Sequence, residues 1–127
     1  MADIDDFKPV NDTFGHVVGD DVLRSVAKIL TSKCNGRNRL EYRYRGEELA
    51  AILTGDEASR ATEVAESIRA DVERLRLDAQ PDLKLTISLD IAAAPDVGRN
   101  AAELVKLADA ALYRGKEEGR NCVRTAD

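Results

Sequence analysis

The sequence has few of the residues that mark specialised classes of protein. Its 127 residues include two cysteines, one histidine and no tryptophan. Cys34 and Cys122 lie far apart and outside any C-x-x-C pattern, so neither a disulfide framework nor a zinc site is expected. No apolar run approaches membrane-spanning length, and the acidic N-terminus is unlike a signal peptide. We therefore expect a cytoplasmic domain that does not insert into a membrane.

Positive charge is also scarce. Lysine and arginine number 19 against 24 aspartate and glutamate residues, which gives a net charge of -5. Broad binding to nucleic acid or anionic lipid needs a basic face, so nucleic acid is not an expected partner. A phosphate ligand would instead be held by a few placed cations and metal ions. With 43% hydrophobic and 34% charged residues, the chain has the balance of a soluble globular protein, and residues 1–127 are expected to form a single domain.

Hydrophobic spacing predicts the helices. Apolar residues recur every three or four positions in three segments, which are Asp20 to about Cys34, about Glu57 to Leu77, and Leu104 to about Gly119. The segment Asp5–Gly19 is rich in Asp, Asn, Gly and Pro, and we expect a loop there with at most a short helical turn.

Strands are predicted from alternation and turn residues. The expected strands are the end of one at Met1–Phe7, a hairpin of 39–44 and 48–53 around Arg45 and Gly46, the segment Leu83–Ile91, and a short one at Asn121–Arg124. Strict alternation predicts that Leu83–Ile91 is a half-buried antiparallel strand with Asp90 on its polar side. The order of elements predicts an α+β fold, an antiparallel-rich sheet covered by helices, of ferredoxin-like or polymerase-palm-like character.

Two acids, Glu47 and Glu48, follow Gly46 in the expected hairpin turn. Two interpretations are open: the negative wall of a cation site, or the polar tip of an ordinary hairpin. Asp3, at the end of the first strand, can face Glu48 across the sheet and offer hard oxygen ligands to Mg²⁺. Since neighbouring residues of a strand point to opposite faces, Glu47 reaches the same site only if it still lies in the turn.

Four motifs follow one another along the chain. They are Asp3-Ile4-Asp5-x-Phe7-Lys8-x-x-Asn11-Asp12-x-Phe14-Gly15-His16-x-x-Gly19-Asp20, Arg43-Tyr44-Arg45-Gly46-Glu47-Glu48-Leu49, Thr86-Ile87-Ser88, and Ala108-Asp109-x-Ala111-Leu112-Tyr113-x-x-Lys116-x-x-Gly119-Arg120-Asn121. In order and spacing they closely resemble the GGDEF family of bacterial diguanylate cyclases, which have a fold of the nucleotide cyclase type. The resemblance implies condensation of two GTP molecules into the signalling nucleotide cyclic di-GMP, with release of pyrophosphate. It also implies a Mg²⁺- or Mn²⁺-dependent nucleotidyl transfer across a homodimer, and a sensory or receiver domain elsewhere in the full-length protein.

The resemblance also implies roles for individual residues. Metal ligands would be Asp3, Glu48 and the backbone carbonyl of Ile4, while Glu47 would bind a second metal or activate the attacking hydroxyl. Guanine would be read by Asn11 and Asp20, which without the resemblance would be a turn residue and a helix N-cap. The phosphates would be held by Lys116, Arg120, Lys8 and Gly46. Lys116 and Arg120 are four residues apart, so both would project together from the end of one helix. The alternative for these two is an ordinary solvated helix end, where positive charge is favourable.

The chain departs from the family pattern at several positions. Arg45 replaces the first glycine of the signature, and Asp90 replaces a strand glycine. The family's N-terminal helix and part of its first strand have no counterpart in the chain. Gly36 and Arg39 stand where many members carry an inhibitory Arg-x-x-Asp, so feedback inhibition by that route is not expected. Arg45, Asp90 and the absent N-terminal segment favour an alternative function, a degenerate domain that binds GTP without turnover and serves as a regulatory or dimerisation module.

Overall fold

The computed structural model describes residues 1–34, 39–53, 59–93 and 100–126, and for residues 39–45 it describes the backbone alone. The strands are β1 (Ala2–Ile4), β2 (Arg39–Arg45), β3 (Glu48–Leu53), β4 (Ile87–Ile91) and β5 (Val123–Thr125). The helices are α1 (Phe7–Phe14), α2 (His16–Lys33), α3 (Ala61–Arg74) and α4 (Ala101–Glu117). The order agrees with the expected one except for the additional helix α1.

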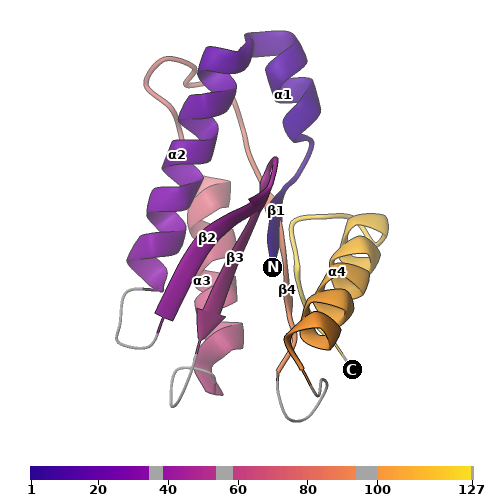
Figure 1. Cartoon of the computed structure of the whole chain (residues 1–127). Coiled ribbons are helices and arrows are strands. Elements are labelled where there is room, and N and C mark those ends of the chain that lie inside the picture. The colour runs from indigo at the N-terminus through magenta and orange to yellow at the C-terminus, as the bar shows by residue number, and fades with distance from the viewer. Residues whose placement is uncertain (35–38, 54–58, 94–99, 127) are drawn as a thin grey trace.

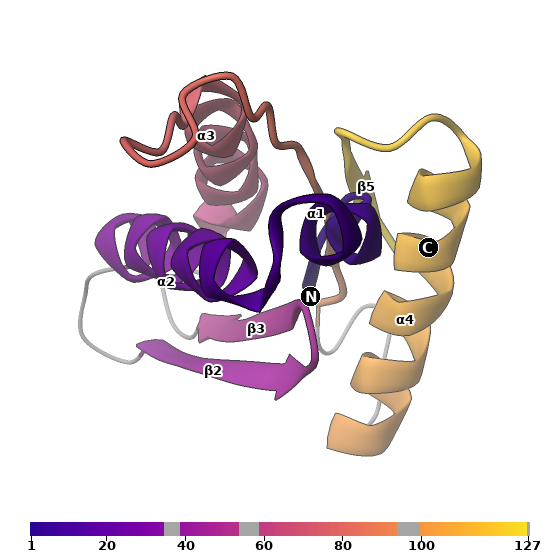
Figure 2. The same ribbon diagram turned by 90° about the horizontal axis from the view of Figure 1, so that it is seen from above.

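The five strands form one sheet in the order β2-β3-β1-β4-β5, which places β1 at its centre. Neighbouring strands are antiparallel, except that β4 and β5 are parallel. Figures 1 and 2 show α2 and α3 on one face of the sheet and α4 on the other. The predicted α+β architecture, an antiparallel-rich sheet covered by helices, is confirmed.

The main core lies between the central strands and the helices α2 and α3. Its most deeply buried apolar members are Ile4, Val22, Val26, Ile68, Val72 and Ile87. On both helices these residues are four positions apart, so each helix turns one apolar face to the sheet. Within the described ranges, no helix is long and apolar enough to cross a membrane.

The loop expected over Asp5–Gly19 is wrong. This segment forms α1 and the first turn of α2, because Phe7 and Val10 lie one helical turn apart and both side chains are buried in the core. Pro9 falls in the first turn of α1, where a backbone N–H has no partner within the helix, so it does not interrupt the helix. The break between the two helices occurs at Gly15, whose φ of 88° favours glycine.

Two predicted elements are shorter in the structure. The second long helix spans Ala61–Arg74, not about Glu57 to Leu77; residues 54–58 lie outside the described part. The alternating segment Leu83–Ile91 is a strand only over Ile87–Ile91, although Leu83 is buried in the same core. The hairpin strands and the helix near the C-terminus agree closely with the prediction.

The expected half-burial of β4 is also wrong. Ser88 and Asp90, on the side expected to be polar, are only 1% and 3% exposed, because α4 packs on that face of the strand. Both carboxyl oxygens of Asp90 are buried without a hydrogen-bond partner within the described residues. Burial raises the pKa of Asp90 to about 7, although the positive amino group of Met1 acts in the opposite direction.

This burial predicts a pH-dependent stability. Because the folded-state pKa of Asp90 lies above its unfolded value of about 3.9, the stability of the folded chain decreases as pH rises between the two values. We expect the free energy of unfolding to fall by about 1–3 kcal/mol from about pH 5 to pH 8, measured by urea denaturation. The fall should be clearly smaller in Asp90→Asn than in the matched control Asp82→Asn, whose aspartate is exposed. Equal pH profiles of the two variants would contradict this assignment.

Candidate active site

The central strand β1 brings two of the predicted site acids together. Asp3 pairs directly with Glu48 across the antiparallel β1 and β3, and it pairs with Ser88 on β4 at its other side. Directly opposite residues of antiparallel strands have Cβ atoms about 4.5–5.5 Å apart. The two carboxylates are therefore neighbours at one end of the sheet, as the sequence predicts.

Glu47 lies in the turn between β2 and β3, which is the condition under which it can reach the same end of the sheet as Glu48. Its carbonyl oxygen accepts a hydrogen bond from the backbone N–H of Ile4 at 3.4 Å, which ties the turn to β1. Gly46 has a φ of 48°, and a Cβ added to it would meet no atom within 4 Å. This left-handed backbone conformation favours glycine in the turn. The side chain of Arg45 lies outside the described part.

Negative charge is concentrated at Asp3. Burial raises the pKa of Asp3 to about 6; the Lys116 ammonium opposes this rise, and the carboxylates of Glu47 and Glu48 add to it. Asp3 Oδ1 is buried, and Lys116 Nζ lies 3.4 Å from it. A buried carboxylate oxygen that faces a cation at this distance is suited to binding a cation.

The donor set suits a divalent ion that also binds a ligand. In the described ranges, no three His, Cys, Asp or Glu side chains are close enough to form a complete metal cage. Mg²⁺ is typically held by one or two carboxylates, with waters and substrate phosphates completing the octahedron. Asp3, Glu48 and the carbonyl of Ile4 fit this pattern, since they are few, hard oxygen donors at one end of the sheet.

Asp5 is a site residue that the sequence reasoning did not single out. Its side chain is 1% exposed, and its carboxylate accepts hydrogen bonds from Thr86 Oγ1 at 2.8 Å, Ser88 Oγ at 2.8 Å and the backbone N–H of Asn121 at 2.9 Å. Burial alone would raise the pKa of Asp5, but these hydrogen bonds and one from Lys116 together lower it. The alternation in Asp3-Ile4-Asp5, which directs Asp5, just after β1, to the same side as Asp3, is the signal that could have identified it.

Lys116 reaches this cluster from α4. Its Nζ lies 2.9 Å from Asp5 Oδ1, 3.4 Å from Asp3 Oδ1 and 3.4 Å from the carbonyl oxygen of Ile4. Lys116 is 21% exposed and Asp3 15%, so the ion pair is only partly screened by solvent. The structure therefore places the predicted phosphate-binding lysine among the predicted metal ligands.

The expectation that Arg120 projects with Lys116 from one helix is wrong. The helix α4 ends at Glu117, and the N–H of Arg120 bonds to the carbonyl of Gly115 at 3.0 Å, as in a Schellman-type helix end. Arg120 lies in the following loop, where its Nε is 3.5 Å from Asp6 Oδ1. Among the described non-glycine residues, positive φ angles occur at Asp6, Arg120 and Asn121, which all border the Asp3–Asp5 segment. Such backbone conformations concentrate at functional sites.

The two predicted guanine readers lie on neighbouring helices. Asn11 is on α1 and Asp20 on α2, so Asn11 is not a turn residue and Asp20 is not an N-cap, because α2 begins four residues earlier at His16. A Cβ on Gly19 would be 1.8 Å from Asn11 Oδ1. The bare backbone of Gly19 is therefore what lets the Asn11 carboxamide lie against α2, one residue from Asp20.

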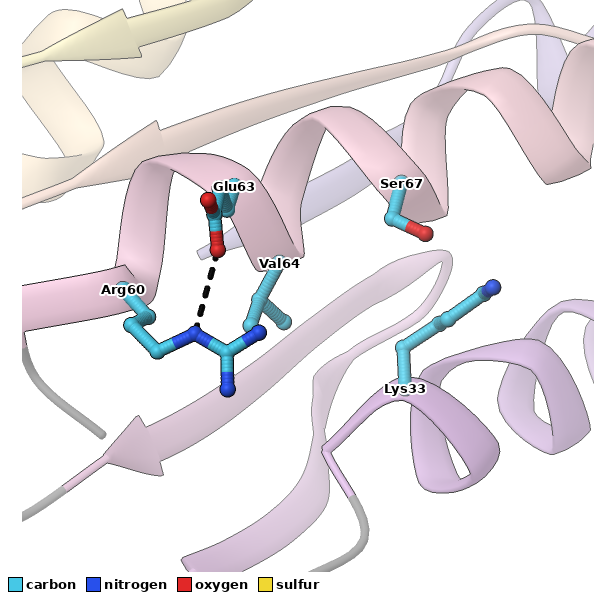
Figure 3. Close-up of a pocket in the computed structure, with 5 residues that line it drawn as sticks. All are labelled: Lys33, Arg60, Glu63, Val64 and Ser67. Atoms are coloured by element: carbon cyan, nitrogen blue, oxygen red, sulfur yellow. Dashed lines mark hydrogen bonds and ion pairs between the residues drawn. The ribbon is translucent and has the colours of Figure 1, made fainter.

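A separate cleft of about 310 Å³ lies at the other end of α2, about 20 Å along the helix from Gly19. Its lining residues come from the end of α2 and from α3 with the residue before it; they are Lys33, Arg60, Glu63, Val64 and Ser67. Figure 3 shows the ion pair between Arg60 Nε and Glu63 Oε2, which are 3.0 Å apart. Lys33 is paired with Asp71 at 3.1 Å. This cleft is distinct from the acidic site.

The contact between Asn11 and Gly19 predicts an inverted effect of alanine. Glycine to alanine in a helix interior normally stabilises by about 1 kcal/mol, but Gly19→Ala would force the Asn11 carboxamide to turn away, so this gain should be lost or reversed by up to about 1 kcal/mol. Thermal or urea unfolding measures the difference. In an Asn11→Ala background the collision partner is absent, and Gly19→Ala should become neutral or stabilising. A cost that is the same in both backgrounds would contradict this packing.

Comparison with known proteins agrees with the geometry. The family model described as "Diguanylate cyclase, GGDEF domain" matches residues 1–122. The probable diguanylate cyclase DgcT of Escherichia coli (strain K12) is 43% identical in an alignment of 131 positions that covers all of this chain and 28% of DgcT. Diguanylate cyclase A of Treponema denticola is 42% identical in an alignment of 125 positions that covers 97% of this chain and 33% of that protein. The chain thus spans about a third of the curated relatives it matches.

A solved structure shares the fold. The coiled coil and GGDEF domain of DgcB from Caulobacter crescentus, in complex with c-di-GMP, matches with a TM-score of 0.88 and 35% identity, over 98% of this chain and 66% of that one. The sheet order, the pairing of Asp3 with Glu48 and the match over residues 1–122 converge on one assignment. This chain belongs to the GGDEF domain family of diguanylate cyclases.

Proposed function

We propose that this chain is the catalytic domain of a diguanylate cyclase, which condenses two GTP molecules into cyclic di-GMP and pyrophosphate. The observation that carries the proposal is the direct pairing of Asp3 with Glu48 beside a turn that holds Glu47. Family membership supports it, because relatives that are 43% and 42% identical bear the name diguanylate cyclase.

Asp3, Glu48 and the carbonyl of Ile4 would hold a Mg²⁺ or Mn²⁺ ion. A divalent ion bound there would neutralise the triphosphate and polarise the α-phosphate. Asp3 is suited to this role because its Oδ1 is buried beside Glu48 and already faces a cation, the Lys116 ammonium at 3.4 Å. In the turn, Glu47 would bind a second ion or accept the proton of the attacking 3′-hydroxyl.

The rest of the triphosphate would be held by cations and backbone near β1. Lys116 lies 2.9 Å from Asp5 and Arg120 lies 3.5 Å from Asp6, so both cations are already at the β1–α1 turn. Lys8, exposed in the first turn of α1, and the backbone of Gly46 would complete the phosphate site. Arg120 offers a planar fork that matches phosphate oxygens.

Guanine would lie at the α1–α2 pair. The carboxylate of Asp20 would accept hydrogen bonds from the guanine N1–H and 2-amino group, which adenine cannot donate together. Asn11, packed on Gly19, would contribute both a donor and an acceptor. Asp20 is exposed, so its carboxylate is accessible to a base.

The reaction requires two copies of the chain. Each would bring one GTP; the 3′-oxygen of each nucleotide forms a bond to the α-phosphorus of the other, and the bond from that phosphorus to the bridging oxygen of pyrophosphate breaks. The chain has one pairing of Asp3 with Glu48, so a homodimer supplies the second site. The relatives are about three times as long as the matched segment, which suits control by a sensory or receiver domain elsewhere in the protein. The domain would act in the cytoplasm, where GTP is available.

An alternative is a domain that binds GTP without turnover and serves as a regulatory or dimerisation module. Arg45 at the first signature position and the buried carboxyl of Asp90 favour it. Both functions include binding of GTP, but only the cyclase forms cyclic di-GMP.

The test of the cyclase is product formation. Concentrated protein with GTP and Mg²⁺ or Mn²⁺ should yield cyclic di-GMP by chromatography, and Glu48→Gln should reduce the rate at least about a hundredfold because the cation loses a ligand. Glu63→Gln, at an exposed position of α3, makes the same charge change and should retain the rate. GTP binding with no product in the unsubstituted chain would support the regulatory module instead.

The test of base recognition is nucleotide selectivity. Asp20→Asn should weaken GTP binding by about tenfold to a hundredfold, the size of hydrogen bonds to a charged group, while ATP binding stays nearly unchanged. Its neighbour Asp21, paired with Arg24 at 3.0 Å, provides the control Asp21→Asn, which should affect neither nucleotide. Calorimetry measures both affinities. An equal loss for GTP and ATP would remove Asp20 as a base reader.

A further inference from the structure

The ammonium group of Lys116 occupies a cage of oxygen atoms at the end of β1. Its neighbours are one carboxylate oxygen each from Asp3 and Asp5, at 3.4 and 2.9 Å, and the carbonyl oxygen of Ile4 at 3.4 Å. Asp3 and the Ile4 carbonyl are also the groups that would bind the divalent ion. The same two oxygen donors therefore serve two different cations.

A lysine ammonium and a divalent ion cannot share these donors without cost. Two cations about 4 Å apart repel strongly in a partly buried site, since the effective dielectric constant there is about 20 and not 80. Lys116 is only 21% exposed, so solvent does not remove the repulsion. Binding of a divalent ion at Asp3 thus requires the ammonium to move away.

We propose that Lys116 is the resident counter-ion of the metal site, which neutralises Asp3 before the substrate binds and withdraws to the triphosphate when the metal arrives with it. This inference rests on the proposed function. It adds that the domain disfavours a divalent ion alone and favours the ion together with a nucleotide, because only the nucleotide offers the displaced ammonium a new anionic partner.

Asp5 gives the movement a fixed pivot. Its carboxylate is held by Thr86, Ser88 and the backbone of Asn121, and it is 1% exposed, so it does not follow the lysine. The shorter of the two ion-pair distances of Lys116 is the one to Asp5, at 2.9 Å against 3.4 Å to Asp3. Lys116 can therefore leave Asp3 and Ile4 and still keep its contact with Asp5.

The experiment measures binding of Mn²⁺ alone, without nucleotide, by the electron paramagnetic resonance signal of the free ion. Lys116→Met should bind Mn²⁺ at least about tenfold more tightly than the unsubstituted chain, since the competing charge is gone. Lys106→Met removes the same charge from an exposed position of α4 and should leave Mn²⁺ binding unchanged. Lys116→Gln is a second variant, and the rise in melting temperature on adding Mn²⁺ is a second readout for both variants.

A further substitution separates this inference from the proposed function. In the Lys116→Met chain, Asp3→Asn should abolish the gain in Mn²⁺ affinity. If Lys116→Met and Lys116→Gln bind Mn²⁺ no more tightly than the unsubstituted chain, the counter-ion role is wrong, while cyclic di-GMP formation still tests the cyclase separately. If the gain appears but survives Asp3→Asn, the ion is not at Asp3, and both the counter-ion role and the proposed metal site are overturned.

Discussion

The site depends on the position of β1 in the middle of the sheet. A strand of three residues there pairs with β3 on one side and with β4 on the other, so Asp3 lies opposite both Glu48 and Ser88. Because helices cover both faces of the sheet around its central strand, the side chains of β1 are largely removed from water, and a carboxylate there requires a cation. The accumulation of acids around Asp3 is thus a consequence of sheet topology.

The second constraint is the buried carboxylate of Asp5, which connects segments distant in sequence. It receives hydrogen bonds from β4 and from the loop after α4, and it pairs with Lys116 near the end of that helix. A buried charge is tolerated when each of its oxygens is hydrogen-bonded, and such an arrangement fixes its partners in turn. Asp5 therefore positions the C-terminal segment that carries Lys116 and Arg120 beside the acids of β1.

The sequence predicted the parts of the structure that depend on local pattern. The hairpin and the apolar faces of the helices follow from periods of two and of three to four residues. It did not predict α1, because the Asp, Asn and Pro content of the segment concealed the burial of Phe7 and Val10. It did not predict that Asp90 is buried, because the helix α4, which lies later in the chain, covers that residue. It also did not predict the contact of Lys116 with Ile4, which are 112 residues apart in the sequence. Those features are tertiary, and no local pattern contains them.

The central claim is that Asp3 and Glu48 share one divalent ion with the triphosphate of GTP. A crystal of the protein grown with Mn²⁺ and a non-reactive GTP analogue, measured at the manganese absorption edge, tests it directly. The account predicts an anomalous peak between the two carboxylates, next to the Ile4 carbonyl and in contact with phosphate oxygens. A nucleotide bound with its manganese away from both carboxylates would contradict it.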